Sequence, residues 1–239
     1  MSRRLLVYGA TGVALAHFLR HTWPRQCETF PAALEASDAV LVIDDLDPEP
    51  DIGIPVIRTS IARADGLCMA AAWNAGLDWA TWSTEAPAVM ILGADGVLLK
   101  PIEELPATGF GAGPIWYEKP CRLRGEWGTG CYYVFTRAVF SRYRYYEAFR
   151  NWGYEDCDLE VCQLWADGIL KSDLDVRAMH VWHEQRSWHT PGGEASNTLL
   201  YVRRRIRTSQ RLGLDPRTMP TSPREAPFHQ EALQLEGVA

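Results

Sequence analysis

The sequence predicts an α/β fold in which a mostly parallel sheet is flanked by helices. In roughly the first 100 residues, short apolar segments of strand length alternate with longer segments of helical periodicity, a pattern typical of a parallel sheet with helices on both faces. Two of the apolar segments end in acidic residues. The chain has 239 residues, of which 47% are hydrophobic, and this suits a single domain with a full core.

The elements of the first half follow one another in regular order. Asp44 and Asp45 come directly after the second strand, and Asp95 follows the fourth. Because open parallel sheets bind ligands at the carboxyl ends of their strands, these acids fall on the expected binding edge. The expected strands are residues 4–8, 39–43, 54–57 and 88–92, and the expected helices are residues 13–21 and 66–82.

The second half is expected to form an α/β extension of the same domain, from residue 101 to residue 212. Beyond it, prolines interrupt any regular pattern, so residues 213–239 are expected to form a tail that is draped over the body or mobile. The expected elements are strands at 110–117, 131–135 and 175–182, a loop at 118–130, an acidic helix from residue 155, and an arginine-rich helix at 196–211.

Composition narrows the classes of function. The formal net charge is −6, which argues against duplex nucleic acid as a partner, because neutralising phosphates needs a basic surface. The apolar run at residues 5–8 is too short for a signal core or a spanning helix, so we expect a cytoplasmic protein without a membrane span. The six cysteines show no zinc spacing, and we expect them to be reduced and mostly buried.

The most informative segment is residues 152–160, Trp-Gly-Tyr-Glu-Asp-Cys-Asp-Leu-Glu, which leads into an amphipathic helix. Glu155 and Asp156 would lie in its first turn, where the helix dipole favours anions. We therefore expect both carboxylates to be ionised, and such a group at a pocket rim can accept a proton from a hydroxyl. The alternative is that these acids only complement the dipole.

A second candidate site is a metal centre at strand ends. Asp95 follows an apolar strand, and a carboxylate there can hold Mg²⁺ or Mn²⁺ against a diphosphate. His180 and His183 end the last strand, and imidazole suits Mn²⁺ when a carboxylate is a co-ligand. The alternatives are that Asp95 belongs to an ordinary Ala-Asp-Gly turn, that His180 is a core residue and that His183 is a surface residue. His189, in a following loop, belongs to the same site or to no site.

A third pattern is Gly9-Ala10-Thr11-Gly12 after the first strand, which invites a dinucleotide-binding interpretation. The pattern is incomplete because the third glycine is missing. No Tyr-x-x-x-Lys pair follows, which a short-chain-dehydrogenase-like enzyme needs. A tight first turn beside a nucleotide explains the glycines equally well.

The order of these motifs resembles the GT-A-type glycosyltransferases over roughly residues 5–190. The strand ending in Asp-Asp, the helix containing Ala-Trp-Asn-Ala-Gly-Leu at 72–77, and Ala-Asp-Gly at 94–96 resemble their nucleotide-sugar half. Residues 152–158 resemble the Trp-Gly-x-Glu-Asp-x-Asp/Glu motif of their galactosyltransferase-like C-terminal region, and residues 128–137 resemble the strand and turn before it. The resemblance thus implies a nucleotide-sugar half at 1–100 and an acceptor half at 101–212.

The resemblance implies a role for each matching position. Asp156 corresponds to the catalytic base of inverting members, and Glu155 to a residue that positions the acceptor. The metal ligands would be Asp95, His183 and a possible second histidine, His180; the nucleotide would meet Asp44 or Asp45 and lie near Arg63 and Asn74; and the acceptor would meet Trp127, Trp152, Tyr154 and Asp158.

The implied activity is transfer of a hexose from a UDP-sugar to a hydroxyl of a saccharide or other acceptor, with inversion and with Mn²⁺ or Mg²⁺ as cofactor. The sugar would be galactose, N-acetylgalactosamine or glucose. The chain departs from the family where Gly93 replaces the first aspartate of the Asp-x-Asp motif. That departure keeps open a catalytically inactive sugar- or nucleotide-binding module, and the Gly9–Gly12 pattern keeps open an NAD(P)-dependent reductase.

Overall fold

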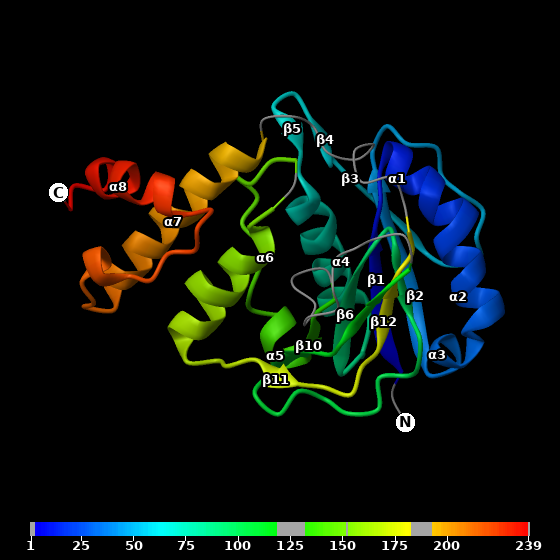
Figure 1. The fold of residues 1–239 in the computed structure, drawn as a ribbon. Helices are drawn as coiled ribbons and strands as arrows, with labels where there is room; N and C mark the ends of the chain where they lie inside the picture. The colour runs from blue at the N-terminus through cyan, green and yellow to red at the C-terminus, as the bar shows by residue number, and fades with distance from the viewer. Residues whose placement is uncertain (1–2, 119–131, 152, 183–192, 239) are drawn as a thin grey trace.

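The computed structural model describes residues 3–118, 132–151, 153–182 and 193–238, and it confirms the mixed α/β architecture (Figure 1). A seven-stranded sheet with the order β11-β8-β10-β6-β1-β2-β3 runs through the body. Its strands are β1 (Arg4–Gly9), β2 (Ser37–Asp44), β3 (Val56–Thr59), β6 (Ala88–Gly93), β8 (Phe110–Ala112), β10 (Val134–Thr136) and β11 (Ser172–Asp173).

The parallel part of the sheet is buried on both faces. β1 pairs in parallel with β2 and β6, and β2 pairs in parallel with β3. Leu5 and Val7 pack in the core with α4 (Met69–Ser83), whereas Leu6 and Tyr8 pack in a second core with the N-terminal helices. Such two-sided burial explains why these strands are continuous apolar runs. The covering helices lie on opposite sides of the sheet, α4 on one and α1 (Gly12–His17), η1 (Phe18–Thr22), α2 (Trp23–Thr29) and α3 (Pro31–Glu35) on the other (Figure 1).

Helix α4 begins later than the expected helix at 66–82. Gly66 has a φ of 123°, which a right-handed helix cannot accommodate. Gly66–Leu67 instead form a short strand, β5, that pairs with β4 (Ala62–Arg63). The expected start was therefore wrong by three residues, because glycine allows a hairpin at that position.

The structure also has a second, three-stranded sheet with the order β7-β12-β9. The single strand expected at 110–117 is two strands, β8 and β9 (Ile115–Tyr117), because Gly113 and Pro114 break it. A side chain at Gly113 would overlap the backbone of Val176. The strand expected at 175–182 is confirmed only as β12 (Ala178–His180), which pairs with β7 (Gly96–Leu98). This sheet places His180 opposite Gly96.

The acidic segment is helical, as predicted, from residue 155 onward. Its turns are α6 (Glu155–Cys157), η2 (Asp158–Leu164), which is π-helical, and η3 (Trp165–Asp167). Gly168 ends it in the left-handed conformation, with a φ of 78°. Another short helix, α5 (Arg137–Phe140), follows β10.

The C-terminal part differs from the irregular tail that was expected. After α7 (Gly193–Arg211) and a short turn, η5 (Pro216–Thr218), the chain forms α8 (Ala226–Leu235). The two helices form a hairpin at one end of the molecule (Figure 1). Pro227 is tolerated because it lies in the first turn of α8. The hairpin has its own small core, which contains Val202, Ile206, Ala232 and Leu233.

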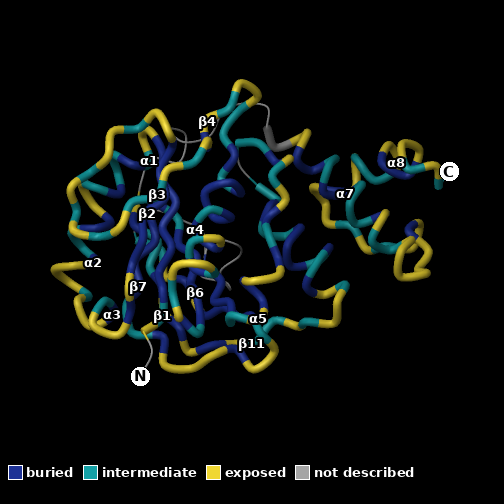
Figure 2. Tube along the Cα trace, turned by 180° about the vertical axis from the view of Figure 1, so that it is seen from behind, coloured by how far each residue is buried: buried dark blue, intermediate teal, exposed yellow. Residues whose placement is uncertain are grey.

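Burial follows these layers. The inner strands of the main sheet are almost entirely buried, whereas its edge strands β3 and β11 are partly exposed. Exposed residues are also frequent in the α7–α8 hairpin (Figure 2). Within the described part of the chain, no helix combines the length and apolarity needed to cross a membrane.

The contact between α4 and β1 yields a stability prediction. A side chain at Gly76 of α4 would overlap Val7 of β1. Gly76→Ala should therefore lower the free energy of unfolding by about 1–3 kcal/mol, as overpacking does, although alanine is the better helix former. Urea unfolding measures this change as a lower midpoint with an unchanged slope. Trp82→Ala, at an exposed position of the same helix, is the control, and equal midpoints for the two variants would contradict the predicted packing.

Candidate active site

Asp95 and His180 meet where β6 and β12 end. The Asp95 Oδ2 atom lies 2.9 Å from the His180 Nε2 atom, and Tyr132 donates a hydrogen bond from its hydroxyl to Asp95 Oδ1 at 3.3 Å. The Val181 amide donates to the Asp95 carbonyl at 2.7 Å. Burial alone would lower the pKa of His180, but the hydrogen bond and negative charge of Asp95 outweigh it and raise that pKa.

This pair fits a divalent metal by its donor set. A carboxylate oxygen and an imidazole nitrogen are ligands that suit Mn²⁺, and the sheet brings them together from positions 95 and 180. Among the described residues, no group of three or more His, Cys, Asp or Glu could hold a metal. His183 and His189 lie outside the described residues. A metal held by Asp95 and His180 would therefore take further ligands from a bound diphosphate or from those positions.

The two acids after β2 have different environments. Asp44 is buried, and its carboxylate accepts hydrogen bonds from the backbone amides of Leu46, Ile61 and Ala62 at 3.0, 2.7 and 2.5 Å. Burial would raise its pKa, but these three bonds together lower it. Asp45 is exposed. Asp44 thus holds the loop after β2 to the segment after β3, and Asp45 has the more accessible carboxylate.

Arg63 and Asn74 meet through a residue that the sequence did not single out, Glu147. Its carboxylate accepts from Arg63 Nη2 at 2.7 Å and from Asn74 Nδ2 at 3.0 Å. Asn74 also pairs with the backbone of Tyr145, donating to its carbonyl at 2.9 Å and accepting from its amide at 2.8 Å. Burial would raise the pKa of Glu147, but these two donors lower it. The network therefore ties α4 and the β4–β5 hairpin to the segment before the acidic helix.

The acidic helix starts from an unusual turn. Asn151, Gly153 and Tyr154 have φ values of 63°, 104° and 72°, and left-handed conformations are uncommon for residues other than glycine. Tyr154 immediately precedes the first helical residue. Its ring stacks on that of Tyr201 of α7, with centroids 4.9 Å apart. Trp127 and Trp152, the other aromatic residues expected near an acceptor, lie outside the described residues.

The expectation that Glu155 and Asp156 are both ionised was wrong for Glu155. Glu155 is buried, and this burial together with the charge of Asp156 raises its pKa to about 8. Burial also raises the pKa of Asp156, although backbone hydrogen bonds oppose that effect. Desolvation thus outweighs the stabilisation that a helix N-terminus offers to anions. Glu155 therefore holds a proton near neutral pH, and its position next to Asp156, whose pKa is also raised, suits acid–base chemistry.

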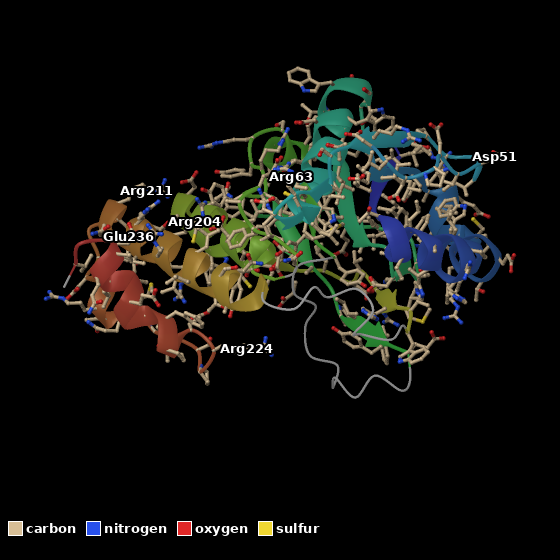
Figure 3. All side chains as sticks on the ribbon, turned by 90° about the horizontal axis from the view of Figure 1, so that it is seen from above. Asp51, Arg63, Arg204, Arg211, Arg224 and Glu236 are labelled. Atoms are coloured by element: carbon tan, nitrogen blue, oxygen red, sulfur yellow. The ribbon has the colours of Figure 1, made fainter. Side chains whose placement is uncertain are left out.

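Two further acids of this helix are paired inside the protein. Asp158 is fully buried and accepts two hydrogen bonds from the Arg204 guanidinium of α7, one of them 3.0 Å long. Arg204 lies on the α7–α8 hairpin, as does Glu236, which pairs with Arg203 and Arg207 (Figure 3). Glu160 accepts from the Tyr133 hydroxyl and lies 3.0 Å from Lys171 Nζ. The bonds between Asp158 and Arg204 join the acidic helix to α7.

Two consecutive tyrosines connect the candidate sites. Tyr132 bonds to Asp95, and Tyr133 bonds to Glu160 of the acidic helix. They pack in the two different cores of the sheet, as expected for adjacent residues in extended chain. The segment before β10 thus contacts the strand-end pair with one side chain and the acidic helix with the next. The Tyr-Tyr sequence after Gly130-Cys131 was the available signal for this role.

Comparison with known proteins identifies the fold but no close relative. No protein-family model matches the sequence, and no curated protein matches it. GalNAc-T7, solved with UDP, GalNAc and Mn²⁺, superposes over 99% of this chain with a TM-score of 0.53 and 12% identity. This chain spans 55% of that protein.

A Drosophila β-1,4-galactosyltransferase 7 variant, solved with manganese, UDP-Gal and xylobiose, superposes with a TM-score of 0.52 and 12% identity. The superposition covers 79% of this chain and 75% of that protein. The chain has a GT-A-type fold. The fold expected from the sequence resemblance is therefore confirmed, and the correspondence of the acidic motif at 152–158 stays a prediction.

The raised pKa of Glu155 predicts a pH dependence of stability. Its carboxyl holds a proton in the folded protein up to about pH 8 but has an ordinary pKa of 4.5. Between these values the folded state binds the extra proton, so the free energy of unfolding falls as the pH rises. Between about pH 5 and pH 9, the free energy of unfolding of the wild type should fall by at least about 1.4 kcal/mol more than that of Glu155→Gln. This difference is the equivalent of one pKa unit. Urea unfolding of both proteins at both pH values measures this, and a pH-independent difference would contradict it.

Proposed function

We propose that this protein is a metal-dependent glycosyltransferase that moves a hexose from a nucleotide-sugar to an acceptor hydroxyl. The observation that carries the proposal is the 2.9 Å contact between Asp95 and His180 at the carboxyl edge of a GT-A-type sheet. A carboxylate and an imidazole that converge from distant strands at this edge suit the binding of a metal–diphosphate group. The acidic helix, contacted by the neighbouring tyrosine, supplies the second chemical function that a transfer needs.

On the donor side, Asp95 and His180 would hold Mn²⁺ or Mg²⁺, with His183 as a further candidate ligand. When bound, the metal neutralises charge on the leaving diphosphate. Gly93, in place of an acid, leaves Asp95 as the carboxylate of this strand end. Asp45, exposed after β2, is the candidate contact for the nucleoside.

The other candidate residues on the donor side, Asp44, Arg63 and Asn74, are ordered by hydrogen bonds within the protein. Asp44 shapes the loop that carries Asp45 by holding three backbone amides. Arg63 and Asn74, the other candidate contacts for the nucleotide, are both held by hydrogen bonds to Glu147. The nucleoside would thus meet a loop and a hairpin that buried hydrogen bonds have already ordered.

On the acceptor side, Asp156 would act as the base. It takes the proton of the acceptor hydroxyl while that oxygen attacks the anomeric carbon and the bond from this carbon to the diphosphate oxygen breaks. A single displacement of this kind inverts the anomeric configuration. Glu155, protonated below about pH 8, can donate a hydrogen bond that positions the acceptor. Tyr154, Trp127 and Trp152 are the candidate aromatic contacts for a sugar ring. Asp158 supports Tyr154 through α7, because it binds Arg204 and Tyr154 stacks on Tyr201 of the same helix.

The proposed donor is a UDP-sugar with galactose, N-acetylgalactosamine or glucose. This choice is supported by the acidic motif at 152–158, which resembles that of galactosyltransferase-like enzymes. It is also supported by the two solved structures of the same fold, which contain UDP with GalNAc and UDP-Gal.

The reductase alternative is disfavoured by the loop after β1. The Gly12 amide, at the start of α1, donates to the Asp47 carboxylate at 3.0 Å. A dinucleotide fold uses such an amide for the pyrophosphate, and a carboxylate at this place repels one. The inactive binding module is tested by the next two experiments.

The Asp156→Asn variant tests whether Asp156 acts as a base or only complements the helix dipole. Asparagine keeps the shape and hydrogen bonding but cannot take a proton at neutral pH. Transfer should fall by roughly 10²–10⁴-fold, the usual contribution of a general base, while UDP-sugar affinity is unchanged. Steady-state kinetics and calorimetric titration measure the two quantities. Glu155→Gln should cost less turnover and more acceptor affinity, and a fully active Asp156→Asn protein would refute the mechanism.

UDP and Mn²⁺ should stabilise the protein more together than UDP does alone. UDP at about 100 times its Kd stabilises by about 2.7 kcal/mol, which raises Tm by about 5–10 °C in a domain of this size. Thermal unfolding with and without a chelator measures the gain from the metal. Asp95→Asn should abolish that gain. Asp38→Asn, at the opposite end of β2 in an exposed pair with Arg3, should retain it, and equal UDP stabilisation with and without metal would contradict metal use.

A further inference from the structure

Asn197, a buried residue of α7, bonds to the backbone at the turn before the acidic helix. This residue is 2% exposed. Its Oδ1 accepts a hydrogen bond from the Arg150 amide at 3.1 Å, and its Nδ2 donates to the Arg150 carbonyl at 2.7 Å. The same Nδ2 donates to the Gly153 carbonyl at 3.2 Å. One amide group therefore pairs with the backbone before the turn, at Arg150, and within it, at Gly153.

The turn that Asn197 holds has a backbone that needs support. Asn151 and Tyr154 both have positive φ values, at 63° and 72°, and such residues keep this conformation only where their surroundings impose it. On the other side, Asn151 is paired with Leu67 of β5, with its amide 2.6 Å from the Leu67 carbonyl and its Oδ1 3.2 Å from the Leu67 amide. The turn is thus clamped between the β4–β5 hairpin and α7.

The same face of α7 contacts the acidic helix further on. Tyr201, four residues after Asn197 and hence on the same face of α7, stacks on Tyr154 at 4.9 Å. Arg204, one turn beyond, binds Asp158. Glu155 and Asp156 lie between these contacts in sequence, so the direction of both carboxyls depends on how α7 holds the turn and the helix.

We propose that Asn197 is a positioning residue for Glu155 and Asp156. Its amide holds the turn formed by Asn151, Gly153 and Tyr154 in the one conformation that presents both carboxyls to an acceptor; this rests on the proposed function. Asparagine suits the task because its short side chain has both a donor and an acceptor. Aspartate can serve the Arg150 amide but would leave the Arg150 and Gly153 carbonyls facing a carboxylate.

The test compares Asn197→Leu with Val202→Ala. Val202 is fully buried between α7 and α8, so its truncation loosens α7 without touching the turn. Asn197→Leu should lower kcat by roughly 10²-fold, the scale of a 1 Å misplacement, with unchanged UDP affinity. Val202→Ala should keep the wild-type kcat even if its Tm falls as far. If Asn197→Leu does not fold, Asn197→Asp, which keeps the bond to the Arg150 amide, is used instead.

A second readout does not depend on activity. NMR titration of the Glu155 carboxyl should show its pKa falling toward 4.5 in Asn197→Leu, because the opened turn lets water reach it, and unchanged in Val202→Ala. The proposal is overturned if the two variants lose kcat equally, or if the Glu155 titration is the same in wild type and Asn197→Leu. If the wild type transfers no sugar from any nucleotide-sugar, the proposed function fails, and the titration still decides whether Asn197 controls the carboxyls.

Discussion

The need of buried carboxylates for hydrogen-bond donors organises this molecule. A carboxylate that leaves water without a donor or a cation becomes protonated instead. The chain carries six more acidic than basic side chains and still buries acids at the carboxyl edge of its sheet and in its acidic helix. For Asp95 and Asp158 the donors come from segments distant in the sequence, so satisfying these acids also fixes the positions of those segments. The buried acids of these two regions are Asp44, Asp95, Glu155, Asp158 and Glu160.

The kind of donor separates supporting acids from candidate reactive ones. Asp44 is served by three backbone amides and Asp158 by a guanidinium, and each holds two segments together. Asp95 is served by an imidazole and a hydroxyl, which are donors that a metal can displace or share. Glu155 has the backbone amides of Gly153 and of its own residue to offset its burial, and its pKa still rises. The acids with the weakest compensation are therefore the ones suited to bind a metal or exchange a proton.

The elements were predictable because their signals are local. Alternating apolar segments predicted the parallel sheet, and polar residues at strand ends predicted a site with Asp95, His183 and a possible second histidine, His180. Asp95 and His180 do meet across 85 positions, and His183 lies outside the described residues. The irregular tail was a wrong prediction, because four prolines outweighed an apolar pattern that forms α8 against α7.

Glu147 and Asn197 gave no signal of their own in the sequence. Their roles arise from hydrogen bonds to backbone and side chains 44 to 84 positions away, which no periodicity encodes. Asp158 bonds to Arg204 across 46 positions, and no pattern in the sequence indicated that Arg204 pairs with a buried acid. Local patterns thus predicted the scaffold and the strand ends, while the contacts that orient the acidic helix required the fold.

The anomalous scattering of manganese in crystals grown with UDP and Mn²⁺ tests the central claim most directly. If Asp95 and His180 hold the metal, one manganese peak will lie at coordination distance from both the Asp95 carboxylate and the His180 imidazole, with the diphosphate of UDP as a further ligand. UDP bound at another place, or bound at this edge with no manganese beside Asp95, would contradict it.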